Sequence, residues 1–310
     1  MRQPKASLDL FAVSLLTVLC VLLGVGQVAM KIGNEGISPF LQAGLRSAGA
    51  LVLLGGWCLA RGIPILLTGR QWGPGLLAAL FFTLEFALLY PGLERTTAAR
   101  GVTFLYTSPL FVAVGAHFLI AGDRLSATKV AGLLVALAGI AVVLSDRGGG
   151  EASLTGDILC LAAAFAWGSL TVIARGTSLA TARAETIIVT YLWVSGILLV
   201  ALSIAMGERG VFNPTPIVVG SLAYTIVFVV FITFATHMWL LTLYPPSKVM
   251  AFVMLTPVFG VGAGALLLGE PIGWRLGLGL VVILSGLWLV NRPAAARPAA
   301  AAGDARKAAS

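Results

Sequence analysis

The amino-acid sequence predicts an all-α membrane protein of ten transmembrane helices, built as two inverted five-helix repeats. Three observations lead to this fold class. The composition is too apolar for a soluble chain, ten stretches are long enough to cross a bilayer, and the two halves share a series of matching residues. Duplicated hydrophobic halves are typical of transporters, whose substrate site lies where the halves meet.

The composition excludes most soluble classes. The chain of 310 residues is 59% hydrophobic and only 10% charged, with a mean hydropathy of +1.00, whereas soluble domains are about half apolar and about a quarter charged. The net charge of +8 is scattered through short loops and the tail, so we expect a lipid bilayer as partner and no nucleic acid. Cys20, Cys58 and Cys160 lie in apolar runs without metal or disulfide spacing, so we expect no metal and no cofactor.

Ten windows are long enough to span the hydrocarbon core, which needs roughly 20 apolar residues. They cover 8–30, 38–60, 74–92, 98–121, 126–144, 154–174, 186–206, 216–244, 249–268 and 273–290. The first window is longer than the apolar core of a signal peptide, which has roughly 7–15 residues, so we interpret it as a retained span. The Ala/Pro-rich segment 293–310 is expected to be a disordered tail.

The basic residues predict the orientation. An even number of spans places both termini on one side, and Lys and Arg are more frequent in the loops of that side than in those of the other. The positive-inside rule then predicts a multi-pass protein of the inner (plasma) membrane with both termini cytoplasmic.

The internal repeat is carried by residues in matching order. Gly24–Lys31 aligns with Gly168–Arg175 when 144 is added to the residue numbers. A shift of 148 aligns Arg100, Phe104 and Pro109 with Lys248, Phe252 and Pro257. A shift of 147 aligns Gly122, Gly132 and Gly139 with Gly269, Gly279 and Gly286. Five spans per half force the second half to begin on the opposite face. The sequence therefore predicts one repeat over 1–146 and its inverted counterpart over 147–292.

These motifs resemble the EamA-type branch of the drug/metabolite transporter superfamily. The resemblance covers roughly residues 8–292 and is carried by Trp167-Gly168-Ser169, by the two Pro elements with their following Phe, and by Gly269-Glu270-Pro271. Leu23 and Asp123-Arg124 depart from it, since the family commonly has Trp and Glu-Pro there. The resemblance implies two inverted five-helix repeats and export of amino acids, aromatic ones among them, or of other metabolites. The motifs that carry it are specific for the fold and do not identify the substrate.

Glu85 is the clearest candidate site residue, because an ionisable group inside a membrane span is costly and by default functional. Phe82, Phe86 and Leu89 share its helical face. Glu85 could pair with a substrate ammonium or take up a proton, since burial favours the neutral carboxyl. The alternative is an acid that only stabilises helix packing.

Four further polar positions complete the central candidates. The shift of 148 maps Glu85 onto Thr233 and Leu89 onto His237, so His237 is predicted on the equivalent face, as a proton relay, a gate or a core imidazole. Arg46, inside the second span, could bind a carboxylate through two hydrogen bonds or snorkel to the interface. His117 is interpreted as structural.

The remaining candidates are aromatic residues and helix breakers. Trp167, Trp239, Tyr90 and Tyr106 are weaker predictions for substrate binding, since each could simply pack. Pro109 and Pro257 are predicted to break their helices and to act as hinges. Arg100 and Lys248, repeat equivalents at opposite mouths, are predicted as gating residues or as interfacial anchors.

The absence of enzyme motifs narrows the possible functions of the chain. The sequence has no Walker-type, zinc-protease or serine-nucleophile motif, so we expect no enzyme. A secondary transporter is favoured, which exports small metabolites, amino acids (aromatic ones among them) being the first candidates, by alternating access around a central cavity. We expect a monomer or a homodimer. The alternatives are a phosphorylated-sugar or nucleotide-sugar carrier and a non-transport membrane protein. Substrate identity and driving force stay open.

Overall fold

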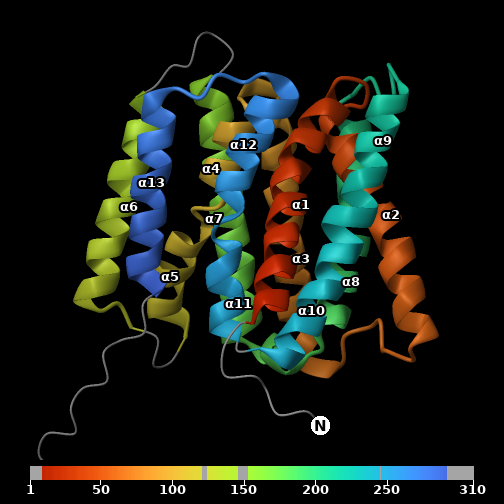
Figure 1. Cartoon of the computed structure of the whole chain (residues 1–310). Helices are drawn as coiled ribbons and strands as arrows, with labels where there is room; N and C mark the ends of the chain where they lie inside the picture. Colours follow the sequence, from red (N-terminus) through yellow and green to blue (C-terminus); the bar gives the residue numbers. More distant parts are fainter. Residues whose placement is uncertain (1–8, 121–123, 146–152, 245, 292–310) are drawn as a thin grey trace, which may run out of the picture.

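The computed structural model describes residues 9–120, 124–145, 153–244 and 246–291, and over these residues the chain is a bundle of helices (Figure 1). The α-helices are α1 (Leu10–Asn34), α2 (Pro39–Ala60), α3 (Trp72–Arg95), α4 (Ala98–Leu105), α5 (Ser108–Leu119), α6 (Ala127–Ser145), α7 (Leu154–Gly176), α8 (Ala184–Ala205), α9 (Pro216–Tyr224), α10 (Thr233–Leu243), α11 (Pro246–Val253), α12 (Thr256–Leu268) and α13 (Trp274–Asn291). The all-α fold class is confirmed. The predicted repeat boundary at 146/147 and the tail 293–310 lie outside the described residues.

Nine helical stretches in the described ranges are long and apolar enough to cross a membrane. The ninth predicted span, 249–268, is not among them; in it, α12 is a shorter apolar helix than these nine. We call the face on which α1 begins the N-terminal face and the opposite one the far face; they lie at the bottom and top of Figure 1.

Two spans are each broken just before a proline. The fourth predicted span consists of α4 and α5, and the ninth of α11 and α12; Pro109 and Pro257 lie in the first turn of the second piece. Proline lacks the N–H that would continue the preceding helix. A threonine hydroxyl donates to a carbonyl oxygen at each break: Thr107 to Phe104 at 2.6 Å and Thr256 to Val253 at 2.7 Å. The helix breaks expected at the two prolines are present.

Glycines bring two helix pairs into close contact. Gly132 and Gly139 of α6 lie against Gly286 and Gly279 of α13, and the two helices run side by side at the left of Figure 1. In the centre of the bundle, a Cβ on Gly24 would lie 2.6 Å from the backbone nitrogen of Gly260. These glycines therefore serve close packing within the chain.

Candidate substrate-binding site

A cavity of about 260 Å³ lies in the interior of the bundle, and we call it the central cavity. Phe82, Glu85, Phe86 and Leu89 of α3 all line it, as their helical spacing predicts. The other lining residues are Leu23, Gln27 and Met30 of α1, Arg46 of α2, Leu105 and Tyr106 at the end of α4, Trp167 and Leu170 of α7, Ile188 and Tyr191 of α8, and Val229. Seven of the predicted spans thus contribute to one site.

Arg46 and Glu85 bring opposite charges into this cavity. Both residues are only 6% exposed, yet they form no ion pair with each other, and Glu85 has no hydrogen-bond partner among the described residues. The Nε and Nη1 atoms of Arg46 are buried without an acceptor, while its guanidinium lies 4.2 Å from the ring centroid of Phe86. Burying charged groups without partners is costly, so this geometry suits a ligand that supplies both partners.

Gln27 and Tyr191 add two polar groups that the sequence analysis did not select. The Oε1 atom of Gln27 and the hydroxyl of Tyr191 are buried without a hydrogen-bond partner, and both residues line the central cavity. Gln27 shares a helical face with Leu23 and Met30. A lone amide in the apolar first span was the signal that could have revealed it.

Aromatic rings form a wall of the central cavity. The rings of Phe82 and Phe86 are 4.9 Å apart, and those of Phe82 and Tyr191 are 5.4 Å apart. Because aromatic faces and edges pack well against apolar groups, this wall offers room for an apolar side chain beside the charged groups.

A second cavity of about 290 Å³ lies toward the N-terminal face, and we call it the vestibule. Its lining includes Lys129, Arg175 and Asn291, which belong to the helix ends on that face, together with Pro109. Tyr106 and Trp167 line both cavities. Their rings meet edge to face at 5.4 Å, so this pair forms the partition between the vestibule and the central cavity.

Four predicted substrate-binding residues are not brought to the central cavity. Tyr90 is fully buried behind Phe86, with ring centroids 6.1 Å apart. Trp239 is 47% exposed and lies edge-on to Phe11. Thr233 is buried and donates to the carbonyl oxygen of Phe228 at 2.7 Å. His237 is half-buried, one turn further along the same helix.

A π-helical segment, Thr225–Ile232, explains the position of His237. It separates α9 from α10, and a π-helix has more residues per turn than an α-helix. The residues that follow it are therefore rotated about the helix axis relative to the α-helical register. Val229, inside the segment, is the residue of this span that lines the central cavity.

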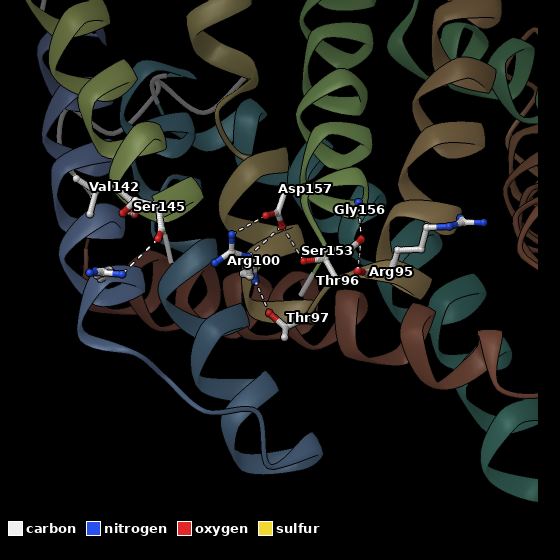
Figure 2. Close-up of polar contacts among 10 residues, drawn as sticks. Arg95, Thr96, Thr97, Arg100, Val142, Ser145, Ser153, Gly156 and Asp157 are labelled. Atoms are coloured by element: carbon white, nitrogen blue, oxygen red, sulfur yellow. Dashed lines mark hydrogen bonds and ion pairs between the residues drawn. The ribbon is translucent and has the colours of Figure 1, made fainter. Parts of the chain in front are cut away.

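The far face carries a buried ion pair that joins α4 to α7 (Figure 2). Arg100 donates from Nε to Oδ1 of Asp157 at 3.0 Å and from Nη2 to Oδ2. The hydroxyl of Thr96 donates to the same Oδ1 atom at 2.7 Å, and the side chains of Arg100 and Asp157 are 5% and 2% exposed. We call Thr96, Arg100 and Asp157 the far-face clasp. Arg100, predicted at the entrance of the transport path, is thus buried in an ion pair and does not line an open entrance.

Glu270 ties the same face together a second time. Its carboxylate accepts hydrogen bonds from the backbone N–H groups of Ala98 and Ala99, at 2.7 and 2.9 Å. Lys31, at the end of α1, lies 3.3 Å from the Glu270 carboxylate and donates to the carbonyl oxygen of Thr96 at 2.8 Å. A carboxylate is favourable at the N-terminus of a helix, so α1, α4 and the end of α12 are held at one point.

Comparison with known proteins decides the family. The profile of the EamA-like transporter family matches residues 10–145 and again residues 154–292. The chain belongs to the EamA-like transporter family. It is therefore a multi-pass integral membrane protein, and as a transporter it contacts lipid and a small-molecule substrate.

Relatives of this EamA-like transporter carry transporter names. The chain is 28% identical to "Uncharacterized transporter YvbV" of Bacillus subtilis over 95% of this chain and 96% of that protein. It is 24% identical to a "Probable amino-acid metabolite efflux pump" of Escherichia coli over 87% of this chain and 91% of that protein. These names agree with the expectation that the chain is not an enzyme.

A solved crystal structure shares the fold of this EamA-like transporter. The two superimpose with a TM-score of 0.64 at 20% sequence identity, over 91% of this chain and 96% of the other. At that identity the likeness concerns the arrangement of the helices and carries nothing about the substrate.

Proposed function

We propose that this EamA-like transporter exports a small zwitterionic metabolite, an amino acid with an apolar or aromatic side chain being the first candidate. The observation that carries the proposal is the presence of two buried opposite charges, Arg46 and Glu85, in one cavity, with two Arg46 nitrogen atoms that have no acceptor. A carboxylate on Arg46 and an ammonium on Glu85 would each receive a partner of opposite charge. The aromatic wall beside them would pack against the side chain.

The name of the Escherichia coli relative as a probable amino-acid metabolite efflux pump supports this substrate class. The rival substrate class, phosphorylated or nucleotide sugars, would favour several basic groups around one site. The central cavity has a single basic residue, Arg46, and it has an acid as well. That combination favours a zwitterion over a polyanion.

Counterflow in proteoliposomes tests the role of Glu85. Vesicles are loaded with unlabelled amino acids, and uptake of a labelled aromatic or aliphatic amino acid is measured. Glu85→Gln removes the charge while keeping the shape, so we expect the half-saturating concentration to rise at least about tenfold, as for loss of one partner of a buried charge pair. Glu94→Gln is the control, because Glu94 is 48% exposed on the far face. Unchanged uptake by Glu85→Gln would refute the assignment.

Arg46 is tested by comparing substrates with and without a carboxylate. Wild-type protein should prefer an amino acid over the amine that results from its decarboxylation, and Arg46→Ala should lose that preference. Arg61→Ala is a matched control, because Arg61 also lies over an aromatic ring, that of Trp57, but is exposed. A preference that survives in Arg46→Ala would count against carboxylate recognition, and counterflow of a sugar phosphate instead would favour the rival class.

We further propose that the halves are inverted repeats, that the N-terminal face is cytoplasmic, and that transport proceeds by rocking of the halves. The two separate family matches, the equivalent helix breaks and the excess of basic residues on one side support this arrangement. Labelling of single introduced cysteines in a loop of each face, from each side of a cell membrane, would test the orientation.

A further inference from the structure

The far-face clasp joins the two halves of the chain. Thr96 and Arg100 belong to the first half and Asp157 to the second. If the halves rock against each other, this contact must separate whenever the central cavity opens to the far face. An inverted repeat would place an equivalent contact on the N-terminal face, where it would have to separate when the cavity opens there.

The N-terminal face contains a hydrogen bond of the same kind. The hydroxyl of Tyr244, just after α10, donates to Oδ1 of Asp9, just before α1, at 2.8 Å. It also joins the two halves. A hydroxyl at the end of one span thus binds an aspartate at the start of another, as Thr96 binds Asp157 on the far face.

The repeat relates most of these residues. Adding 148 to Thr96 and Arg100 gives Tyr244 and Lys248, whereas the shift of 144 that aligns α1 with α7 places Asp9 one helical turn before the position of Asp157. The shift of 148 also relates Pro109 to Pro257, and α11, which carries Lys248, has eight residues as α4 does. Two hydroxyls and two basic residues therefore correspond, and an aspartate lies at the start of the neighbouring helix at each face.

We propose that Asp9, Tyr244 and Lys248 form an N-terminal-face clasp, and that transport opens the two clasps in alternation. Asp9 and Lys248 are then positioning residues, which control access to the central cavity without touching the substrate. The proposal rests on the alternating access and the inverted repeat proposed above, and it is independent of the amino-acid assignment.

The two clasps differ in strength. Arg100 is buried and binds Asp157 through two nitrogen atoms, whereas Lys248 is exposed and Asp9 is half-buried. Lysine is a strongly hydrated point charge, and exposed pairs contribute far less than buried bidentate ones. The resting protein therefore favours a closed far face, with the central cavity accessible from the N-terminal face. That bias suits an exporter that loads its substrate on the cytoplasmic side.

Thiol labelling tests the alternation without any substrate. Cys20, Cys58 and Cys160 are replaced by Ala, and Val229→Cys places a reporter in the central cavity. A membrane-impermeant maleimide is applied to vesicles of either orientation, and the ratio of far-face to N-terminal-face labelling is measured. Arg100→Gln should raise this ratio at least about tenfold. Lys248→Gln and Asp9→Asn should lower it, by about two- to fivefold for a pair at the surface.

Exchanging the charges of Asp9 and Lys248 distinguishes the loss of their pairing from a general disturbance of the fold. The double variant Asp9→Lys with Lys248→Asp keeps both charges and exchanges their positions, so its labelling ratio should return to within about twofold of the parent. Arg209→Gln, an exposed loop residue on the far face, should leave the ratio unchanged. The proposal is overturned if Lys248→Gln moves the ratio in the same direction as Arg100→Gln or leaves it unchanged, or if the swap behaves as the sum of its two substitutions.

Discussion

The two faces of this transporter are built differently. On the far face, carboxylates of Asp157 and Glu270 are buried and hold α1, α4 and α7 together through ion pairs and backbone hydrogen bonds. On the N-terminal face lies the vestibule, whose Arg175 is exposed and has no acidic partner among the described residues. In the proposed repeat, Arg175 corresponds to Lys31, which does have an acidic partner, Glu270. The contacts on one face thus rest on buried charge, whereas on the other they rest on the more exposed N-terminal-face clasp and on aromatic packing at Tyr106 and Trp167.

The largest effect is expected from breaking the far-face clasp. Arg100→Ala would leave Asp157 buried with only the Thr96 hydroxyl as a side-chain partner, at a cost of about 3–5 kcal/mol in the free energy of unfolding. Thermal unfolding in detergent measures this loss. Arg95→Ala is the control: Arg95 is 48% exposed and pairs with Glu94, so about 0–1 kcal/mol is expected. Equal losses of stability in both variants would show that the buried ion pair stabilises the fold no more than the exposed one.

The second-largest loss of stability is expected from substitution of Glu270. Glu270→Gln removes the charge that accepts from two backbone N–H groups and faces Lys31, and we expect a loss of about 2 kcal/mol in stability. Glu208 accepts two similar bonds from Phe40 and Leu41 at 3.1 Å, but it is only half-buried. In the same thermal measurement, Glu208→Gln should lose less, and the reverse order would contradict the role given to burial.

The partition should respond to the loss of one ring. Tyr106→Ala removes an edge-to-face contact with Trp167 that is worth about 0.5–1.5 kcal/mol beyond its buried area. We expect labelling of a Leu105→Cys reporter from the N-terminal face to become several-fold faster. Tyr106→Phe keeps the ring and should label at the parent rate. If both variants label at the parent rate, access from the vestibule does not pass between these rings.

The smallest effect is expected at Arg175. Arg175→Gln removes an exposed charge with no acidic partner in the described part of the chain, so its stability should change by less than about 0.5 kcal/mol. Lys31, its counterpart in the proposed repeat, contacts Glu270 and Thr96, so Lys31→Gln should lose more stability by thermal unfolding. If the two variants were equally stable, Lys31 on the far face would stabilise the fold no more than Arg175 does on the N-terminal face.

Much of the fold was predictable because hydrocarbon thickness and helix spacing leave few choices. The apolar windows predicted the spans, and i, i+3, i+4 spacing predicted that Phe82, Glu85 and Phe86 share a face that now lines the central cavity. The breaks beside Pro109 and Pro257 followed from the missing N–H of proline.

The rest depended on long-range contacts and local geometry that the sequence does not display. Asp157 lies 57 residues from Arg100, and nothing local marks the two as partners. The π-helical segment Thr225–Ile232 is apolar after its first residue, so no periodicity revealed the rotation that leaves His237 outside the lining of the central cavity. Tyr191 was one aromatic residue among many until its unpartnered hydroxyl was placed in that cavity.

Tyr106 and Trp167 belong to the walls of two cavities at once, and this restricts how the protein can evolve. A substitution at either residue changes substrate fit and access together, so a new specificity gained there would come with altered gating. Phe82, Ile188 and Tyr191 line only the central cavity. Substrate preference can therefore diverge at these three positions while the partition is kept, which is one route by which a single fold can serve many metabolites.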